Sequence, residues 1–194
     1  MKLFIGLFGI LYLGLVIGLR TFLVWRRTGH NPIAFRRDDE LDLYIGRSFV
    51  AIELFWVAAI ASFIFDTETW TVPMEALRDP VIAWVGAGFF VASTLWTLAA
   101  QSQMGTNWRV GIDQTHPTDL VARGLFRWSR NPIFLGIQVA SVGAFLCVPS
   151  AVTLVAVVLG HVVIQIQVRR EEAFLAQRHG ASYAAYRQAV RRWV

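Results

Sequence analysis

Residues 132–168 read PIFLGIQVASVGAFLCVPSAVTLVAVVLGHVVIQIQV and contain no Asp, Glu, Lys or Arg. A transmembrane helix needs only about 20 apolar residues, so this stretch is too long for a single membrane span. Pro149 and Ser150 lie near its middle, and this pair favours a turn. We therefore expect two helices, residues 132–148 and 151–168, that form a tight hairpin within a lipid bilayer.

Three further apolar stretches precede this hairpin. Residues 3–25 are interrupted only by Arg20, residues 48–65 contain Glu53, and residues 81–100 carry no charge. The first stretch is longer than the apolar core of a secretory signal and has no convincing cleavage site, so we interpret it as a retained span. The sequence predicts an all-α, polytopic membrane protein with five transmembrane helices, a C-terminal helical hairpin and cytoplasmic amphipathic segments.

The composition supports this class. Apolar residues make up 56% and charged residues 16% of the 194 residues, and the mean hydropathy is +0.51. A soluble domain of this length needs more polar residues to cover its surface, so a soluble globule and a disordered chain are both excluded. Cys147 is the single cysteine, which excludes an intrachain disulfide and a cysteine-based metal site.

Charges in the loops predict an orientation. Segments 26–47, 101–131 and 169–194 together carry 15 basic residues, whereas the opposite side carries two, Lys2 and Arg78. Because basic loops remain in the cytoplasm, we expect the N-terminus outside and the C-terminus inside, in a bacterial inner membrane. The net charge of +5 on so apolar a chain indicates anionic lipid head groups as partners, and we expect no nucleic acid.

Ionisable residues inside the predicted spans require partners. Arg20 lies five residues before the cytoplasmic end of the first span, and Glu53 lies five residues after the cytoplasmic start of the second. Their similar depth predicts an ion pair. We expect His161 to be a hydrogen-bonded interior residue, since no other metal-ligating side chain stands at metal spacing from it.

The hairpin brings two polar segments to one membrane face. Arg130, Asn131 and Pro132 precede it, and residues 169–172, Arg-Arg-Glu-Glu, follow it. Basic and acidic groups that meet beside an apolar cavity suit a zwitterionic small molecule. A solvated cluster of salt bridges is the alternative that the spacing alone leaves open.

A longer pattern runs through these segments. It reads Leu120-Val121-x-x-Gly124-x-Phe126-x-x-x-Arg130-Asn131-Pro132-x-Phe134-x-Gly136, then Glu171-Glu172-x-x-Leu175 and Gly180-x-x-Tyr183-x-x-Tyr186. This pattern, over about residues 101–193, resembles the isoprenylcysteine carboxyl methyltransferase family. That family belongs to a wider group of membrane methyltransferases, which includes the phospholipid N-methyltransferases.

The chain departs from the usual family pattern at four places. Asn131 stands where the family usually has His, and Phe134 and Phe126 stand where Tyr is common. Gln167 occupies the place of a basic residue that the prenylcysteine enzymes carry one turn before the acidic pair. A prenylated cysteine is therefore not implied as the substrate.

The resemblance implies S-adenosylmethionine as the methyl donor and a lipid-like or lipidated acceptor, with a carboxylate, an amine or a thiol as the accepting group. It implies that Glu171 pairs with the ammonium of the donor, that Arg130 or a backbone amide near Asn131 takes its carboxylate, and that aromatic side chains flank its adenine or sulfonium. The full set of implied donor-binding residues is Leu120, Val121, Gly124, Phe126, Arg130, Asn131, Pro132, Phe134, Glu171 and Glu172. The set expected to bind the acceptor is Arg109, Gln167, Arg169 and Arg170.

These expectations divide the chain into a three-span region, residues 1–100, and a methyltransferase-like region, residues 101–194. We assign no catalytic residue, no metal and no oligomeric state. Two other interpretations remain open: an NADPH-dependent membrane reductase of the sterol-reductase type, and a non-catalytic membrane accessory protein.

Overall fold

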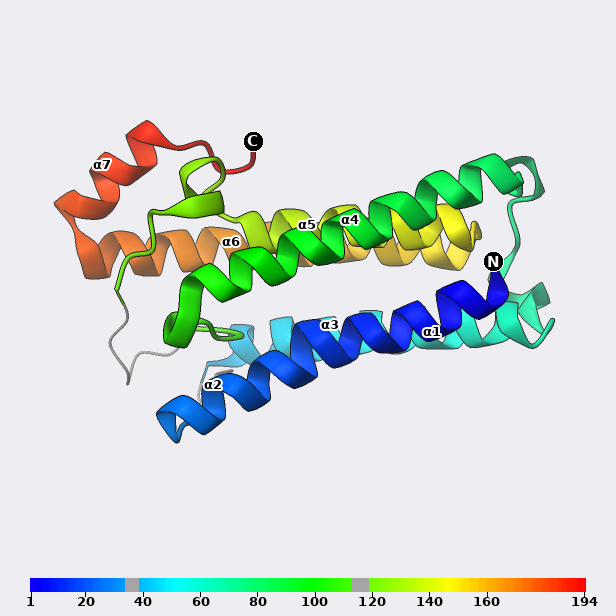
Figure 1. The fold of residues 1–194 in the computed structure, drawn as a ribbon, viewed down its shortest axis with the longest axis horizontal. Coiled ribbons are helices and arrows are strands. Elements are labelled where there is room, and N and C mark those ends of the chain that lie inside the picture. The colour runs from blue at the N-terminus through cyan, green and yellow to red at the C-terminus, as the bar shows by residue number, and fades with distance from the viewer. Residues whose placement is uncertain (34–38, 113–118) are drawn as a thin grey trace.

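The computed structural model describes residues 1–33, 39–112 and 119–194 (Figure 1). Within these ranges the regular structure is helical, apart from isolated β-bridges that pair Ile33 with Val110 and Pro73 with Ser150. The predicted all-α class is confirmed. Short 3-10 turns join the long helices, and they comprise Glu68–Thr71, Glu75–Leu77, Gly105–Asn107 and Gly124–Arg127.

The first long helix is continuous through three parts: α1 (Lys2–Leu13), a π-helical segment (Gly14–Leu19) and α2 (Arg20–Thr28). A π-helical turn displaces the ordinary backbone hydrogen bonds of a helix. Here the carbonyl of Val16 accepts a hydrogen bond from Gln101 Nε2 at 2.9 Å. Because Gln101 lies near the end of a later helix, this bond ties the N-terminal helix to the remainder of the bundle.

Side-chain caps fix the starts of α3 (Glu40–Ile64) and α4 (Pro80–Met104). Asp39 caps α3 and Asp79 caps α4, and each carboxylate accepts hydrogen bonds from two backbone N–H groups of the first turn. A carboxylate at this position satisfies N–H groups that have no partner inside the helix. Both helices therefore begin before the apolar stretches that the sequence shows, and polar residues lie at their ends.

The predicted hairpin is present. It comprises α5 (Pro132–Cys147) and α6 (Ala151–His179), with the turn at Pro149 and Ser150. Ser150 and Thr153 form a reciprocal capping box that starts α6. The last helix, α7 (Ala181–Ala189), follows Gly180, whose φ of 52° reverses the chain direction.

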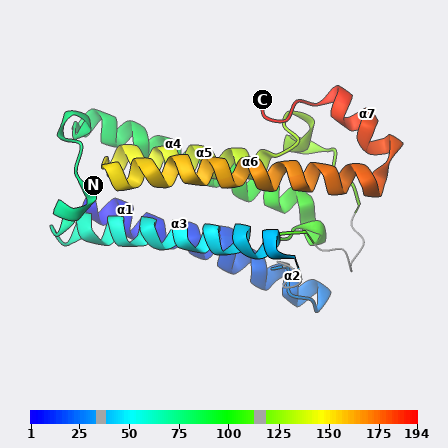
Figure 2. The same cartoon turned by 180° about the vertical axis from the view of Figure 1, so that it is seen from behind.

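The long helices lie in two layers (Figure 1). One layer contains the first helix beside α3, and the other contains α4, α5 and α6. Figure 2 shows, from behind, that α3 and α6 run alongside one another. The N-terminus and α7 lie at opposite ends of the bundle, which places the polar segments that flank the hairpin far from the N-terminus.

Glycines bring α4 and α5 into close contact. A Cβ atom at Gly143 would lie 2.7 Å from the carbonyl oxygen of Gly86 and 2.7 Å from the backbone nitrogen of Phe90. Small residues of this kind let membrane helices approach closely, so that packing replaces the hydrophobic drive that lipid removes. The pair of α4 and α5 thus forms the tightest wall of the bundle.

In the part of the chain that the structure describes, four helices are long and apolar enough to cross a membrane: Lys2–Thr28, Glu40–Ile64, Pro80–Asn107 and Ala151–His179. The chain is therefore a polytopic membrane protein. The fifth expected span, α5, has 16 residues and is about 24 Å long, against a hydrocarbon core of about 30 Å. Four of the five expected spans are therefore long enough to cross the membrane, whereas α5 is shorter than the hydrocarbon core.

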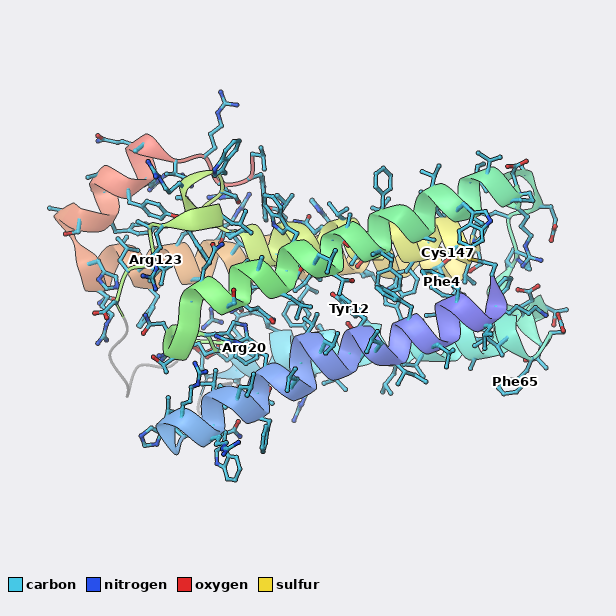
Figure 3. The ribbon with its side chains drawn as sticks, viewed as in Figure 1. Phe4, Tyr12, Arg20, Phe65, Arg123 and Cys147 are labelled. Atoms are coloured by element: carbon cyan, nitrogen blue, oxygen red, sulfur yellow. The ribbon has the colours of Figure 1, made fainter. Side chains whose placement is uncertain are left out.

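The predicted ion pair between Arg20 and Glu53 is wrong. Arg20 donates a hydrogen bond to the carbonyl of Gly105 and lies over the ring of Trp108, at 5.8 Å from its centroid. Figure 3 shows Arg20 and Tyr12 between the two layers. Glu53 and Tyr12 instead line an apolar cavity of about 350 Å³, so similar depth along two helices did not imply the same side of each helix.

Candidate functional site

Glu172 is the hub of a polar cluster at the end of the bundle away from the N-terminus. Its Oε1 atom accepts hydrogen bonds from Arg130 Nη2 at 3.1 Å and from Asn131 Nδ2 at 3.1 Å. Its Oε2 atom lies 2.8 Å from Arg192 Nη2, and this contact raises the pKa of Arg192. We call these four residues the Glu172 clamp. It joins the start of α5, the middle of α6 and the segment after α7.

Residues 183–194, which we call the C-terminal strap, complete the clamp through their backbone. Arg130 Nη1 donates to the carbonyls of Val190 at 2.6 Å and Arg187 at 3.2 Å, and its backbone N–H donates to Arg191 at 2.9 Å. Four of the five N–H donors of the Arg130 guanidinium thus bind Glu172 and backbone carbonyls of the strap. Its expected role as a partner of the donor carboxylate stays a prediction.

A tyrosine holds the strap against the Gly124–Arg127 turn. Tyr186 donates a hydrogen bond from its hydroxyl to the carbonyl of Phe126 at 2.6 Å. Burial raises the pKa of Tyr186 to about 12, so the hydroxyl keeps the proton that it donates. Phe126, predicted to flank the donor, is buried beneath this contact.

The backbone conformation and the neighbours of residue 124 leave room only for glycine. Its φ is 60°, and a Cβ atom there would collide with the side-chain amide of Gln103. That amide accepts a hydrogen bond from the backbone N–H of Leu125 at 2.7 Å. Beside it opens a pocket of about 580 Å³, which Trp128 and Arg127 border.

The start of α5 is fixed from α4. Trp96 Nε1 donates to the carbonyl of Pro132 at 2.9 Å. One turn later, a Cβ atom at Gly136 would overlap Thr97 Oγ1 and would lie 3.2 Å from Trp96 Cδ1. Asn131 precedes this helix, but within the described residues its side chain does not cap it and binds Glu172 instead.

Glu171 faces a different side of α6 from Glu172, because adjacent residues on an α-helix point about 100° apart. It accepts a hydrogen bond from Gln167 Nε2 at 2.7 Å, and Arg109 attracts its charge. Gln167 Oε1 is buried and, within the described ranges, has no hydrogen-bond partner. The unpaired oxygen of Gln167, next to the half-buried carboxylate of Glu171, suits a ligand that brings N–H donors.

The remaining predicted residues fall into two groups. Arg170 forms ion pairs with Asp39 at 2.7 Å and Asp42 at 2.9 Å, so it joins α6 to the start of α3, and its expected contact with the acceptor stays a prediction. Arg169 is exposed on α6. Near the start of α5 and in the segment before it lie the half-buried side chains of Leu120, Val121 and Phe134.

Sequence reasoning missed the parts of the site that lie beyond the family pattern. Arg192, which binds Glu172, follows the last residue of the pattern, Tyr186. Gln103, which binds the Gly124 turn, precedes its first residue, Leu120. No spacing rule links Arg192 to Glu172, twenty residues earlier. The one available signal was chemical: two adjacent carboxylates near a membrane face need cationic partners, and Arg191 and Arg192 supply candidates.

Among the described residues no group of three or more His, Cys, Asp or Glu side chains could hold a metal ion. The sequence model of the phospholipid methyltransferase family matches residues 81–182, which is more than half of the chain. This range begins at the start of α4 and ends within α7. No curated protein and no solved structure matches the chain.

Proposed function

This chain belongs to the phospholipid methyltransferase family, and we propose that it methylates the amino group of a phospholipid head group. The chain is an S-adenosylmethionine-dependent membrane methyltransferase. Membership selects this class over a reductase and over a non-catalytic accessory protein. We further propose which group accepts the methyl and which residues bind the methyl donor and the lipid acceptor.

The observation that carries the proposal is the pair of Gln167 and Glu171. Two acceptors one turn apart, the orphaned Oε1 of Gln167 and the carboxylate of Glu171, fit an ammonium group with three N–H donors. S-adenosylmethionine supplies such an ammonium, together with the methyl on its sulfonium. We assign Glu171 and Gln167 to this ammonium.

The start of α5 is the proposed partner of the donor carboxylate. Because the side chain of Asn131 is turned to Glu172, the first backbone N–H groups of this 16-residue helix lack a side-chain cap in the described structure. Free N–H groups and the helix dipole favour an anion at this place. The Glu172 clamp holds that helix start in position, so we treat Arg130, Asn131 and Arg192 as positioning residues.

An amine is the acceptor that the sequence and the family favour together. The ammonium must first lose a proton to water at the cytoplasmic face. The nitrogen lone pair then forms the new N–C bond as the S–C bond breaks, and the sulfur leaves with that electron pair as a neutral thioether. Such a displacement depends mostly on alignment of the reacting atoms, which a rigid pair of α4 and α5 supports. Asn131 and Phe134 depart from the prenylcysteine motif, which argues against a carboxylate on a prenylated cysteine.

The topology completes the proposal. We propose that α5 is the fifth crossing, because it runs antiparallel to α6 in the hairpin and lies beside α4 and α6 in one layer (Figure 1). An odd number of crossings places the C-terminal strap and the candidate site in the cytoplasm, as the basic loops predict. Residues 1–100 then form the supporting region and residues 101–194 the donor-binding region of an inner-membrane enzyme.

Binding and turnover together test the proposal. Titration calorimetry in nanodiscs measures the affinity for S-adenosylmethionine, and transfer of tritiated methyl measures activity on phosphatidylethanolamine, with a prenylated cysteine as the competing acceptor. Glu171→Gln should weaken donor binding by two orders of magnitude or more, since breaking a buried charge pair costs about 3–5 kcal/mol. Glu40→Gln, at an exposed position of α3, is the matched control and should bind as the wild type does.

Unchanged donor affinity in Glu171→Gln would remove Glu171 from the site. Methylation of the prenylated cysteine in preference to phosphatidylethanolamine would overturn the amine as acceptor.

A further inference from the structure

Three polar side chains form a chain of hydrogen bonds between α5 and α6, deep within the apolar stretch. His161 Nδ1 lies 2.5 Å from Gln138 Oε1, and Gln165 Nε2 lies 3.3 Å from His161 Nε2. A neutral histidine satisfies both contacts if Nδ1 carries the proton and Nε2 accepts from Gln165. We call these residues the amide–histidine relay.

The relay lies on the surface of the bundle. His161 is exposed, so the expectation that it is an interior residue is wrong, although its hydrogen bonding is confirmed. Gln138 and His161 line a groove of about 530 Å³ along the seam of α5 and α6. Apart from Ser141, its other walls are apolar, and the exposed members include Phe89, Val142 and Val158.

Within the described residues, one strong acceptor of the amide–histidine relay, the side-chain carbonyl oxygen of Gln165, has no hydrogen-bond donor. Gln138 also donates to the carbonyl of Phe134 at 3.3 Å, and His161 uses both ring nitrogens. Within the described residues, the carbonyl oxygen of Gln165 and one N–H of its amide form no hydrogen bond. In a bilayer there is little water to satisfy them, so a lipid-facing amide favours a ligand with polar groups at that depth.

The polar groups on α6 are ordered along one side of the helix. His161, Gln165 and Arg169 are spaced by one turn each, and Arg169 is an exposed cation toward the candidate site end of α6. Glu172 lies seven residues beyond Gln165, close to the same face, so the Glu172 clamp closes the seam at that end. Next to the apolar groove, the surface of α6 therefore presents first the amide of Gln165, which binds the groove residue His161, and then the cation of Arg169.

This order is the order of groups in a glycerophospholipid: phosphate, ester and acyl chain. A surface of this kind in a bilayer is always in contact with lipid, and the polar relay gives one lipid geometry an advantage over the others. The volume also falls in the range of about 300–1,000 Å³ that is typical of small-ligand pockets.

We propose that the seam of α5 and α6 binds a glycerophospholipid, with Arg169 at its phosphate, the Gln165 amide at its ester groups and an acyl chain in the apolar groove. Resting on the proposed function, this lipid is the methyl acceptor, and its head group lies against the Glu172 clamp. The amino group then reaches the start of α5, where the donor carboxylate is proposed to bind.

Photo-crosslinking tests the groove directly. Phosphatidylethanolamine with a diazirine in one acyl chain is incorporated into nanodiscs with the full chain, irradiated, and the labelled peptides are identified by mass spectrometry. We expect labelling of α5 and α6 that saturates and is reduced by excess unlabelled phosphatidylethanolamine. Labelling spread evenly over all lipid-facing helices, or crosslinks between two copies of the chain through this seam, would overturn the proposal.

Matched variants sharpen the result. Val158→Trp fills the groove, whereas Leu159→Trp adds the same ring at a neighbouring lipid-facing residue outside the groove; the two side chains are 53% and 48% exposed. Val158→Trp and Gln165→Leu should reduce saturable labelling at least fivefold and raise KM for phosphatidylethanolamine similarly, with kcat and donor affinity little changed. Leu159→Trp should match the wild type, and equal labelling in both Trp variants would contradict the groove.

The two proposals fail in different ways. If phosphatidylethanolamine is not methylated but labels the seam saturably, the groove stands and its assignment to the acceptor is overturned. If phosphatidylethanolamine is methylated but the seam is not labelled, the function stands and the groove is overturned.

Discussion

Asn131 donates a hydrogen bond from its side-chain Nδ2 to Oε1 of Glu172, at 3.1 Å, across 41 residues of sequence. Asparagine thus supplies a neutral donor to a carboxylate that also binds the guanidinium groups of Arg130 and Arg192. The bond joins two halves of the family pattern that stand on either side of the hairpin. It also turns the asparagine away from the helix start that it precedes.

Asn131→Asp should destabilise the protein. The new carboxylate would lie about 3 Å from Glu172 and would replace a donor with a like charge, in a buried cluster where losing a partner costs about 3–5 kcal/mol. Thermal unfolding in detergent should show a clear fall in Tm. Asn131→His should retain most of the stability, because a ring N–H can still donate.

Arg192→Leu should release the C-terminal strap. The substitution removes two hydrogen bonds to Glu172, from Nε at 3.1 Å and Nη2 at 2.8 Å. Hydrogen exchange of residues 183–194 should become faster by an order of magnitude or more. Arg191→Leu is the matched control, since that side chain is exposed, and equal exchange in the two variants would contradict the clamp.

Gly136→Ala should push α5 away from α4. Its Cβ would overlap Thr97 Oγ1 and would lie 3.3 Å from the carbonyl oxygen of Ser93, and overpacking of this kind costs about 1–3 kcal/mol. Gly88→Ala, in α4, meets nothing within 4 Å and should be neutral or stabilising. Thermal unfolding of both variants in the same detergent measures the difference, and a stable Gly136→Ala would contradict the close approach.

The ion pair of Asp39 and Arg170 should make stability depend on pH in acid. The hydrogen bond from Arg170 lowers the pKa of Asp39 below its ordinary value, so the pair stabilises the folded state above that ordinary value. The contribution is lost as the pH falls through the lowered pKa. Asp39→Asn keeps an efficient helix cap but cannot make the pair. The gap in Tm between wild type and variant should be largest near neutral pH and should vanish at low pH, whereas a constant gap would contradict the linkage.

The orientation can be tested with fusions. A reporter that is active only outside the cytoplasm should be silent when attached after residue 194 and active when inserted in the loop at 66–80. The asymmetry of 15 basic residues against two is the physical reason. The reverse pattern would overturn both the orientation and the cytoplasmic placement of the site.

The hairpin and the long helices were predictable because length and apolarity decide them in a bilayer. Pro149 and Ser150 marked the turn, and the capping box of Ser150 and Thr153 explains why α6 starts there. The extent of the helices was less predictable. Polar ends extend α3 and α6 beyond their apolar stretches, since Asp39 caps one and Arg170 binds the two acids at that end.

Side-chain direction within the bundle could not be predicted. Arg20 and Glu53 lie at comparable depth, yet Arg20 turns to Gly105 and Glu53 to the cavity beside Tyr12. The acidic pair shows the same limit at the candidate site. Its members are adjacent in sequence, but Glu172 is used by the clamp while Glu171 is left beside Gln167. Only the packing of α6 against its neighbours separates the two roles.

The C-terminal strap has a consequence for the order in which the site assembles. Arg130 binds the carbonyls of Val190 and Arg187, and Glu172 binds Arg192, so neither side chain has these partners until the segment after α7 folds back onto the start of α5. The hairpin of α5 and α6 can form before the Glu172 clamp, whereas the clamp needs the hairpin, because it joins residues on both sides of it. Closure of the strap is then the step that completes the cluster.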